Sequence, residues 1–125
     1  MLEKAKAHFR RIVHEEDLKC ILVSEWGDAN QSAHIYFKPM SALSVTSYSR
    51  LIELGSQQTV ESFVDILILR CLDETGKPLF KLVNRTEMLR EVSPIVVCDI
   101  IKQMSEIDAE KATMAICDIE QMEKN

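Results

Sequence analysis

Hydrophobic positions at the start of this chain recur every three or four residues, the spacing of one side of an α-helix. These positions are Leu2, Ala5, Phe9, Ile12 and Val13. The opposite side is polar, and residues 1–14 carry a net charge of +3 because four basic residues stand against Glu3 alone. The pattern predicts an amphipathic helix over about residues 1–17. It leaves two interpretations open: a helix packed on its own domain, or a basic helix that touches an acidic partner or a membrane.

The period changes to two in the next part of the chain. Residues 18–24 form a compact apolar run, and residues 25–32 are rich in turn formers. In residues 33–38, Ala, Ile and Phe alternate with His, Tyr and Lys, as in a half-buried strand. This segment predicts a β-hairpin with an irregular connection, closed by Pro39.

Two helices are predicted next. Ser41 is placed to cap a helix that runs to about Leu54 and ends at Gly55. Residues 60–72 are apolar on nearly every side, which is typical of a central helix. A strand over residues 63–69 is the competing interpretation, but an apolar segment of about 13 residues exceeds the usual length of a strand.

The remainder of the chain predicts a turn and three more helices. Residues 73–78 contain Gly and Pro and read as a tight turn. Asn84 and Glu87 match a capping box that opens a short helix. Ser93 and Pro94 are a typical N-cap and first helical residue for the next helix, and residues 108–122 form a further amphipathic segment.

Together these elements predict a mainly α fold of the α+β type, with an N-terminal amphipathic helix, a small β-hairpin and a bundle of four or five helices. The 125 residues suit one domain, 1–125, in which segments 1–17 and 108–125 are expected to be peripheral. The formal net charge is −5, with 20 acids against 15 bases, and residues 99–125 alone carry −4. We therefore expect no binding to nucleic acid, and no apolar run approaches the roughly 20 residues of a membrane span.

Few residues suggest catalysis or a cofactor. With only three glycines, a phosphate-binding loop is not expected. The four cysteines lack metal-type spacing and lie among apolar residues, so they read as buried free thiols of a reducing compartment. The three histidines have no partner at ligand spacing. The sequence therefore predicts a non-catalytic protein without a metal or cofactor.

Large apolar side chains outside the predicted core are the candidates for protein binding, because aromatic and Met residues are common interface anchors. Trp26 lies in the hairpin connection, and Phe80 follows a surface turn. The alternative for each is a local cluster that fixes its loop to the domain. The candidates are Trp26, Tyr36, Phe37, Met40, Phe80, Ile116, Ile119 and Met122.

The order of several short motifs resembles a known family. Glu-Trp-Gly follows the first strand at residues 25–27, Lys-Pro-Met-Ser-Ala-Leu follows the second at 38–43, and Cys-Leu-Asp-Glu-Thr-Gly-Lys-Pro-Leu-Phe closes the apolar helix at 71–80. Over residues 18–107 the chain is similar to the tail assembly chaperones of long-tailed bacteriophages, the siphovirus group that includes the lambda type.

The resemblance implies a function. Such chaperones coat the long, aggregation-prone tape measure protein and keep it soluble until tail tube subunits assemble around it. It also implies a self-associating protein of the host bacterial cytoplasm that is absent from the mature virion. The start of the chain has charge but no apolar signal core behind it, which agrees with a cytoplasmic location.

Family members are typically made in two forms, and the resemblance implies a longer isoform that arises by ribosomal frameshifting and recruits the tail tube protein. Residues 123–125, Glu-Lys-Asn, can be encoded as GAA-AAA-AAC, which contains a heptamer suited to a minus-one slip. The gene sequence tests this expectation directly.

Two other functions compete with the chaperone. One is a small adaptor or regulatory subunit of a bacterial complex, which genomic context would distinguish. The other is a small thiol- or histidine-dependent hydrolase, which requires a pocket joining a histidine to a cysteine or a carboxylate pair. The charge gradient along the chain adds one physical expectation, namely head-to-tail oligomers that weaken with added salt.

Overall fold

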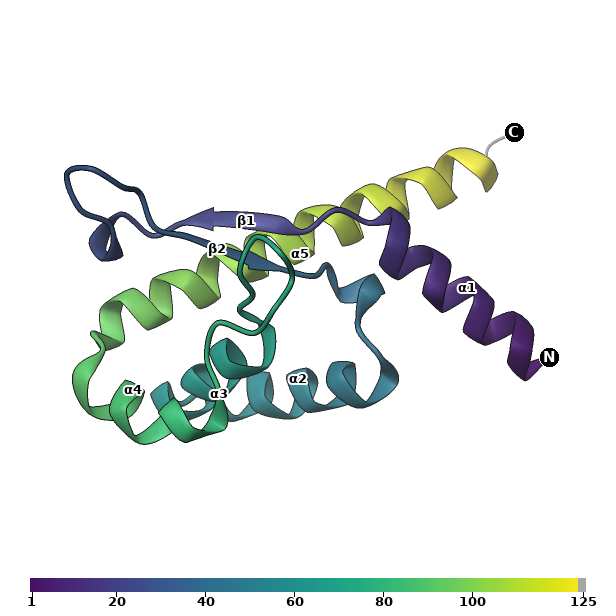
Figure 1. Ribbon diagram of the computed structural model, residues 1–125. Helices are drawn as coiled ribbons and strands as arrows, with labels where there is room; N and C mark the ends of the chain where they lie inside the picture. The colour runs from purple at the N-terminus through teal and green to yellow at the C-terminus, as the bar shows by residue number, and fades with distance from the viewer. Residues whose placement is uncertain (124–125) are drawn as a thin grey trace.

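Five α-helices and a short β-hairpin form the described part of the chain (Figure 1). The computed structural model describes the backbone of residues 1–123 and the side chains of residues 1–110. The helices are α1 (Leu2–Glu15), α2 (Val45–Gln57), α3 (Val60–Arg70), α4 (Arg85–Glu91) and α5 (Pro94–Glu123), and the strands are β1 (Lys19–Leu22) and β2 (His34–Phe37). The predicted mainly α fold is therefore confirmed.

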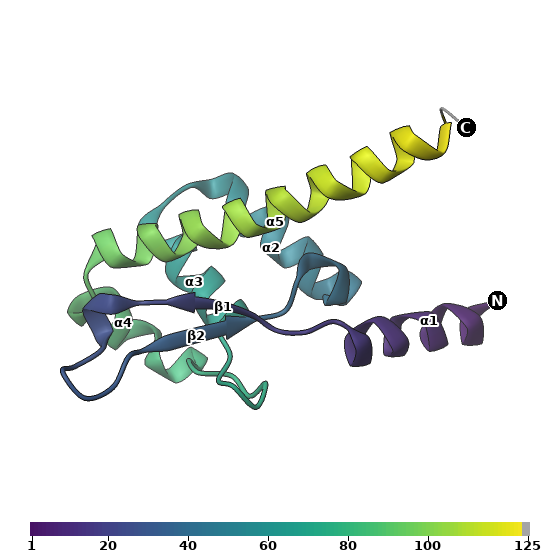
Figure 2. The ribbon, with the colours of Figure 1, turned by 90° about the horizontal axis from the view of Figure 1, so that it is seen from above.

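The elements are arranged in two layers. The hairpin and α5 lie side by side, as the view from above shows, and α2, α3 and α4 lie beneath them (Figures 1 and 2). The central helix α3 contacts α2, α4 and α5. Helix α1 and the last turns of α5 extend beyond these layers at the same end of the molecule (Figure 2).

The hairpin follows the predicted alternation. Its antiparallel register pairs Ile21 with Ile35 and Lys19 with Phe37. Ile21, Ile35 and Phe37 are buried in the core, whereas His34 is exposed. The main core joins this face of the hairpin to α3, α4 and α5 through residues such as Val64, Leu67, Met88, Val97 and Ile100. The compact apolar run therefore identified β1, and the period-two pattern identified β2 and its buried face.

Both ends of α2 differ from the prediction. Ser41 does not cap the helix, because Met40–Ala42 form a 3-10 turn first and the Oγ of Ser44 accepts a hydrogen bond from the backbone N–H of Ser47 at 3.2 Å. Gly55 does not end the helix either. The helix continues to Gln57, and the left-handed conformation that terminates it is adopted by Gln58 at φ 49°.

Helix α3 begins at a reciprocal cap. The Thr59 N–H donates to the Oγ of Ser62, and the Ser62 N–H donates to the Oγ1 of Thr59, each at 3.0 Å. The predicted helix is confirmed, and the competing strand is wrong. Helix α3 ends at Arg70 rather than at residue 72, because the backbone of Leu72 exchanges hydrogen bonds of 2.7 and 3.0 Å with Tyr36 and so extends the hairpin.

The turn after α3 is held by one carboxylate. Asp73 Oδ1 accepts hydrogen bonds from the hydroxyl of Thr75 at 2.6 Å and from the backbone N–H groups of Thr75 and Lys77 at 2.8 and 3.0 Å. The Thr75 hydroxyl, followed by the Lys77 N–H, lowers the pKa of Asp73 below its ordinary value. Gly76 supplies the left-handed residue of the turn at φ 88°. The predicted tight turn is confirmed.

The predicted capping box at Asn84 and Glu87 is wrong. Asn84 already has helical backbone angles, and its Oδ1 accepts a hydrogen bond from the backbone N–H of Lys81 at 2.8 Å. The chain has turned before Asn84, in the 3-10 segment Leu82–Asn84, so the amide stabilises the start of that turn instead of the start of α4.

The two predicted C-terminal helices are one. Helix α5 continues from Pro94 to Glu123 without a break at Asp108, and residues 95–123 contain no Gly or Pro that would interrupt it. The Asp108 carboxylate, in the middle of this helix, forms a tertiary ion pair with Arg70.

Candidate protein-binding groove

An open groove of about 600 Å³ lies between α2, α3 and α5. Its apolar lining comes from Met40, Leu51, Ile52, Phe63, Ile66, Ile101 and Met104. Leu51, Leu54 and Ile66 form a second small core beneath it, with Met40, Phe63 and Ile101 packed around them. The groove is therefore a preformed apolar surface rather than a gap in the packing.

Exposed apolar side chains on α2 extend this surface. Ile52 on the groove wall is 52% exposed, and Tyr48, one helical turn earlier on the same side of α2, is 44% exposed. Gly55 also lines the groove, and a Cβ built there meets no atom within 4 Å. This side of α2 accordingly has room for the side chains of a partner.

A buried ion pair closes one end of the groove. Arg70, whose side chain is 2% exposed, donates from Nη1 to Asp108 Oδ2 at 2.7 Å and from Nη2 to Asp108 Oδ1 at 3.3 Å. Nη2 also donates to the backbone carbonyl of Lys38 at 2.9 Å, and the guanidinium lies 4.8 Å from the centre of the Phe37 ring. Arg70 thus joins α3, α5 and the end of β2 at a single point.

Arg70 and Asp108 compensate each other's charge. Within the described residues, Arg70 Nε is buried without a hydrogen-bond partner, so the guanidinium is partly desolvated and Asp108 provides its charge compensation. Among the described residues that line the groove, Arg70 and Asp108 are the charged ones. The groove therefore offers apolar contact rather than a set of polar groups converging on a small molecule.

Trp26 and Phe80, predicted as anchors, contact each other. Their rings meet edge to face, with centroids 6.1 Å apart and planes at 82°, and both pack against the main core while remaining partly exposed. This arrangement matches the local cluster that the sequence left as the alternative, because it fixes the hairpin connection and the segment after the turn to the same body.

The remaining predicted anchors are distributed widely. Phe37 is completely buried, so the expectation of an exposed ring there is wrong; its strand position turns it into the core, under Arg70. Tyr36 is partly exposed on the other face, where the thiol of Cys20 raises its pKa. Met40 lines the groove. Ile116, Ile119 and Met122 lie outside the described side chains.

The cysteines differ from the prediction of buried thiols. Only Cys71 among the described ones is buried, and burial raises the pKa of its thiol to about 12. Cys20 and Cys98 are exposed, because Cys20 lies on the outer face of β1 and Cys98 on the outer side of α5. Cys117 lies outside the described side chains.

The described side chains form no group of three or more His, Cys, Asp or Glu that could hold a metal ion. His8 and His14 are exposed on α1, and His34 is exposed on the hairpin. No described helix combines the length and apolarity that crossing a membrane requires.

Most of the residues that build the groove were not predicted from the sequence; Met40 is the exception. Arg70 and Asp108 are 38 positions apart, and a single charged residue at the end of an apolar helix was the one available signal. The apolar pattern of α2 is weak in the sequence, so it did not indicate a second apolar side of that helix. Three residues on this side are Tyr48, Ile52 and Gly55.

Comparison of the chain with protein-family models, with curated proteins and with solved structures finds no match.

Proposed function

We propose that this protein is a non-catalytic tail assembly chaperone of a bacteriophage, which binds the tape measure protein and keeps it soluble during tail morphogenesis in the host cytoplasm. The observation that supports the proposal most is the open apolar groove between α2, α3 and α5, bordered by exposed Tyr48 and Ile52. The family resemblance of residues 18–107 supplies the identity of the client.

A groove of this kind suits one side of an amphipathic helix. Helix-in-groove recognition uses apolar anchors repeated every three or four residues, and it tolerates different polar residues on the outer side of the bound helix. Met40, which is partly exposed, lines the groove, and the unbranched Met side chain adapts to differently shaped partners. A chaperone that coats a long client at many different segments requires this tolerance.

The size of the client requires several copies of the chaperone. One groove covers a short stretch of helix, so a long client needs many grooves acting together, each contributing modest affinity. We include self-association in the proposal for this reason. The proposed longer isoform, made by frameshifting, then adds recruitment of the tail tube protein to the same complex.

The test is co-expression with a tape measure protein encoded next to this chain. Wild-type chaperone is expected to keep the client in the soluble fraction and to co-purify with it. A client that remains insoluble, or the lack of any neighbouring tape measure gene, would refute the proposed function. The result would then favour the small adaptor or regulatory subunit.

Variants of the groove make the test specific. Gly55→Trp places a large ring in the groove, and Ile52→Glu places a charge on its wall; each is expected to lower client binding by at least about tenfold, the effect of losing one anchor. Gly55→Ala is the matched control, since a Cβ at this position meets no neighbouring atom. Normal client binding by both disruptive variants, with their folding checked by circular dichroism, would show that the client binds elsewhere.

A further inference from the structure

Helix α1 carries an apolar stripe that the described side chains, residues 1–110, leave at least partly exposed. None of its 14 residues is buried, although Leu2, Phe9 and Ile12 share one side. Within the described part of the chain, α1 contacts the 3-10 turn Met40–Ala42. An amphipathic helix with its apolar side left open is a typical docking element.

Two basic side chains border this stripe. Lys6 and Arg10 are four residues apart, so they lie one above the other along the same edge of the apolar side, about 6 Å apart along the helix. Lys6 also has an exposed ion pair of 3.4 Å with Glu3, which is weak and easily exchanged. Lys4 and Arg11 lie on the opposite, outer side of the helix.

A complementary surface lies at the other end of the molecule. A cleft of about 320 Å³ is lined by Leu79, Phe80, Asn84, Glu87, Met88, Glu91 and Val92. Beside it, Leu82 and Val83 are 74% and 82% exposed. Glu87 and Glu91 are exposed on α4 and, like Lys6 and Arg10, are separated by four residues.

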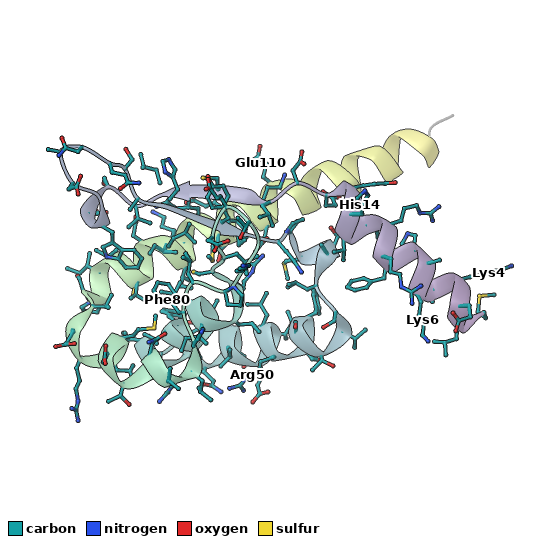
Figure 3. The ribbon with its side chains drawn as sticks, in the orientation of Figure 1. Lys4, Lys6, His14, Arg50, Phe80 and Glu110 are labelled. Carbon is teal, nitrogen blue, oxygen red and sulfur yellow. The ribbon has the colours of Figure 1, made fainter. Side chains whose placement is uncertain are left out.

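The two surfaces cannot meet within one chain. Helix α1 lies at one end of the molecule and α4 at the other in both ribbon views (Figures 1 and 2). Figure 3 shows Lys6 on the projecting helix and Phe80 at the far side of the body. Residues 16–18 alone join α1 to β1, and three residues span at most about 10 Å. Helix α1 can therefore reach this cleft only in a second copy of the chain.

We propose that α1 of one copy docks its apolar stripe onto the cleft of a second copy, with Lys6 and Arg10 facing Glu87 and Glu91. The apolar contact supplies most of the affinity, and the matched spacing of the charges selects the orientation. Every copy carries one helix and one cleft, so the contact is head to tail and generates a ring or an open helical array. This inference deepens the self-association included in the proposed function and identifies the surfaces that carry it.

Charge reversal at each surface tests the contact in the absence of any client. The variant Lys6→Glu/Arg10→Glu has an acidic helix and an acidic cleft, whereas Glu87→Lys/Glu91→Lys has a basic helix and a basic cleft. By sedimentation velocity, each variant alone should associate at least about tenfold more weakly than the wild type, because like charges face each other. An equimolar mixture of the two should regain oligomers, since each helix then finds a cleft of opposite charge.

Two matched controls separate the docking surfaces from net charge. Lys4→Glu/Arg11→Glu makes the same charge change on the outer side of α1, and Glu106→Lys/Glu110→Lys makes the same change at the same spacing on α5. Both are expected to associate like the wild type. The second control also tests the alternative that the acidic end of the chain receives the basic helix.

Several results would overturn the inference. One is a wild-type protein that stays monomeric at high concentration and low salt. Another is normal assembly of either charge-reversal variant alone, or a mixture of the two that fails to regain oligomers. The last is a control variant that loses assembly as the docking-surface variants do. The recovery in the mixture also shows that the variants are folded, and circular dichroism checks this independently. Because no client is present, failure here removes this mode of self-association from the proposed function, whereas client binding in the groove is decided separately by the co-expression test.

Discussion

Asp108→Ala should destabilise the protein more than any other single change in the ion pair at the end of the groove. It leaves the Arg70 guanidinium, 2% exposed, without its carboxylate, while Nη2 keeps only the Lys38 carbonyl and Nε has no partner among the described residues. Removing one partner of a buried pair costs about 3–5 kcal/mol, because the remaining charge stays desolvated. A domain of this size has a free energy of unfolding of about 5–15 kcal/mol, so the loss is a large fraction of the total.

The opposite change should cost less. Arg70→Met keeps most of the buried aliphatic volume, and the Asp108 carboxylate that remains is 14% exposed and can be reached by water. We expect a loss of about 1–3 kcal/mol, mainly from the unpaired carbonyl of Lys38 and from the contact with the Phe37 ring. In the double variant Arg70→Met/Asp108→Ala no charge is left unpaired, so its stability should lie close to that of Arg70→Met.

Urea unfolding of the four proteins of this double-mutant cycle measures the coupling. We expect the double variant to be at least about 2 kcal/mol more stable than the sum of the single losses predicts. A loss below about 1 kcal/mol for Asp108→Ala, or equal losses for the two single variants, would refute the reasoning that the buried guanidinium is the group that requires compensation.

Three further predictions concern separate parts of the molecule. Gly55→Ala should raise the free energy of unfolding by about 0.5–1 kcal/mol in urea titrations, because Gly55 is inside α2 with open space around its Cα; destabilisation would contradict that open space. Cys20 and Cys98 should react with a thiol reagent in the folded protein, and Cys71 only on unfolding, as peptide mapping by mass spectrometry will report. Asp73→Ala should be less stable than the wild type above about pH 4. The difference should vanish as the pH falls through the lowered pKa of Asp73, because the wild type then loses its hydrogen-bonded carboxylate by protonation. A stability difference that does not depend on pH in urea titrations would exclude the carboxylate as its source.

The local elements were predictable wherever one pattern had no competitor. The alternation of Ile35 and Phe37 identified β2 and its buried face, and the apolar run around Leu67 identified the central helix. Boundaries were less predictable. Both Ser41 and Ser44 are chemically suited to cap α2, and the choice depends on the 3-10 turn between them, which the tertiary packing of Ala42 holds in place.

The candidate site was far less predictable than the fold. Among the predicted anchors with described side chains, Met40 alone lines the groove, whereas Phe37 is in the core and Trp26 packs against Phe80. The groove is assembled from three helices that are distant in sequence, and no local spacing encodes how they meet. The cleft at α4 differs, because all of its lining residues lie between Leu79 and Val92 in the sequence.

The helices before α5, the antiparallel hairpin with its buried face and the end-to-end charge gradient could all be predicted from the sequence, because each depends on the order of neighbouring residues. Which apolar surfaces stay uncovered depends on tertiary packing. An apolar side of a helix looks the same in sequence whether a neighbour covers it, as on α3, or leaves it open, as on α1. Tertiary packing likewise decided that Asp108 pairs with Arg70, since the two residues are 38 positions apart and only the approach of α3 to α5 brings them together.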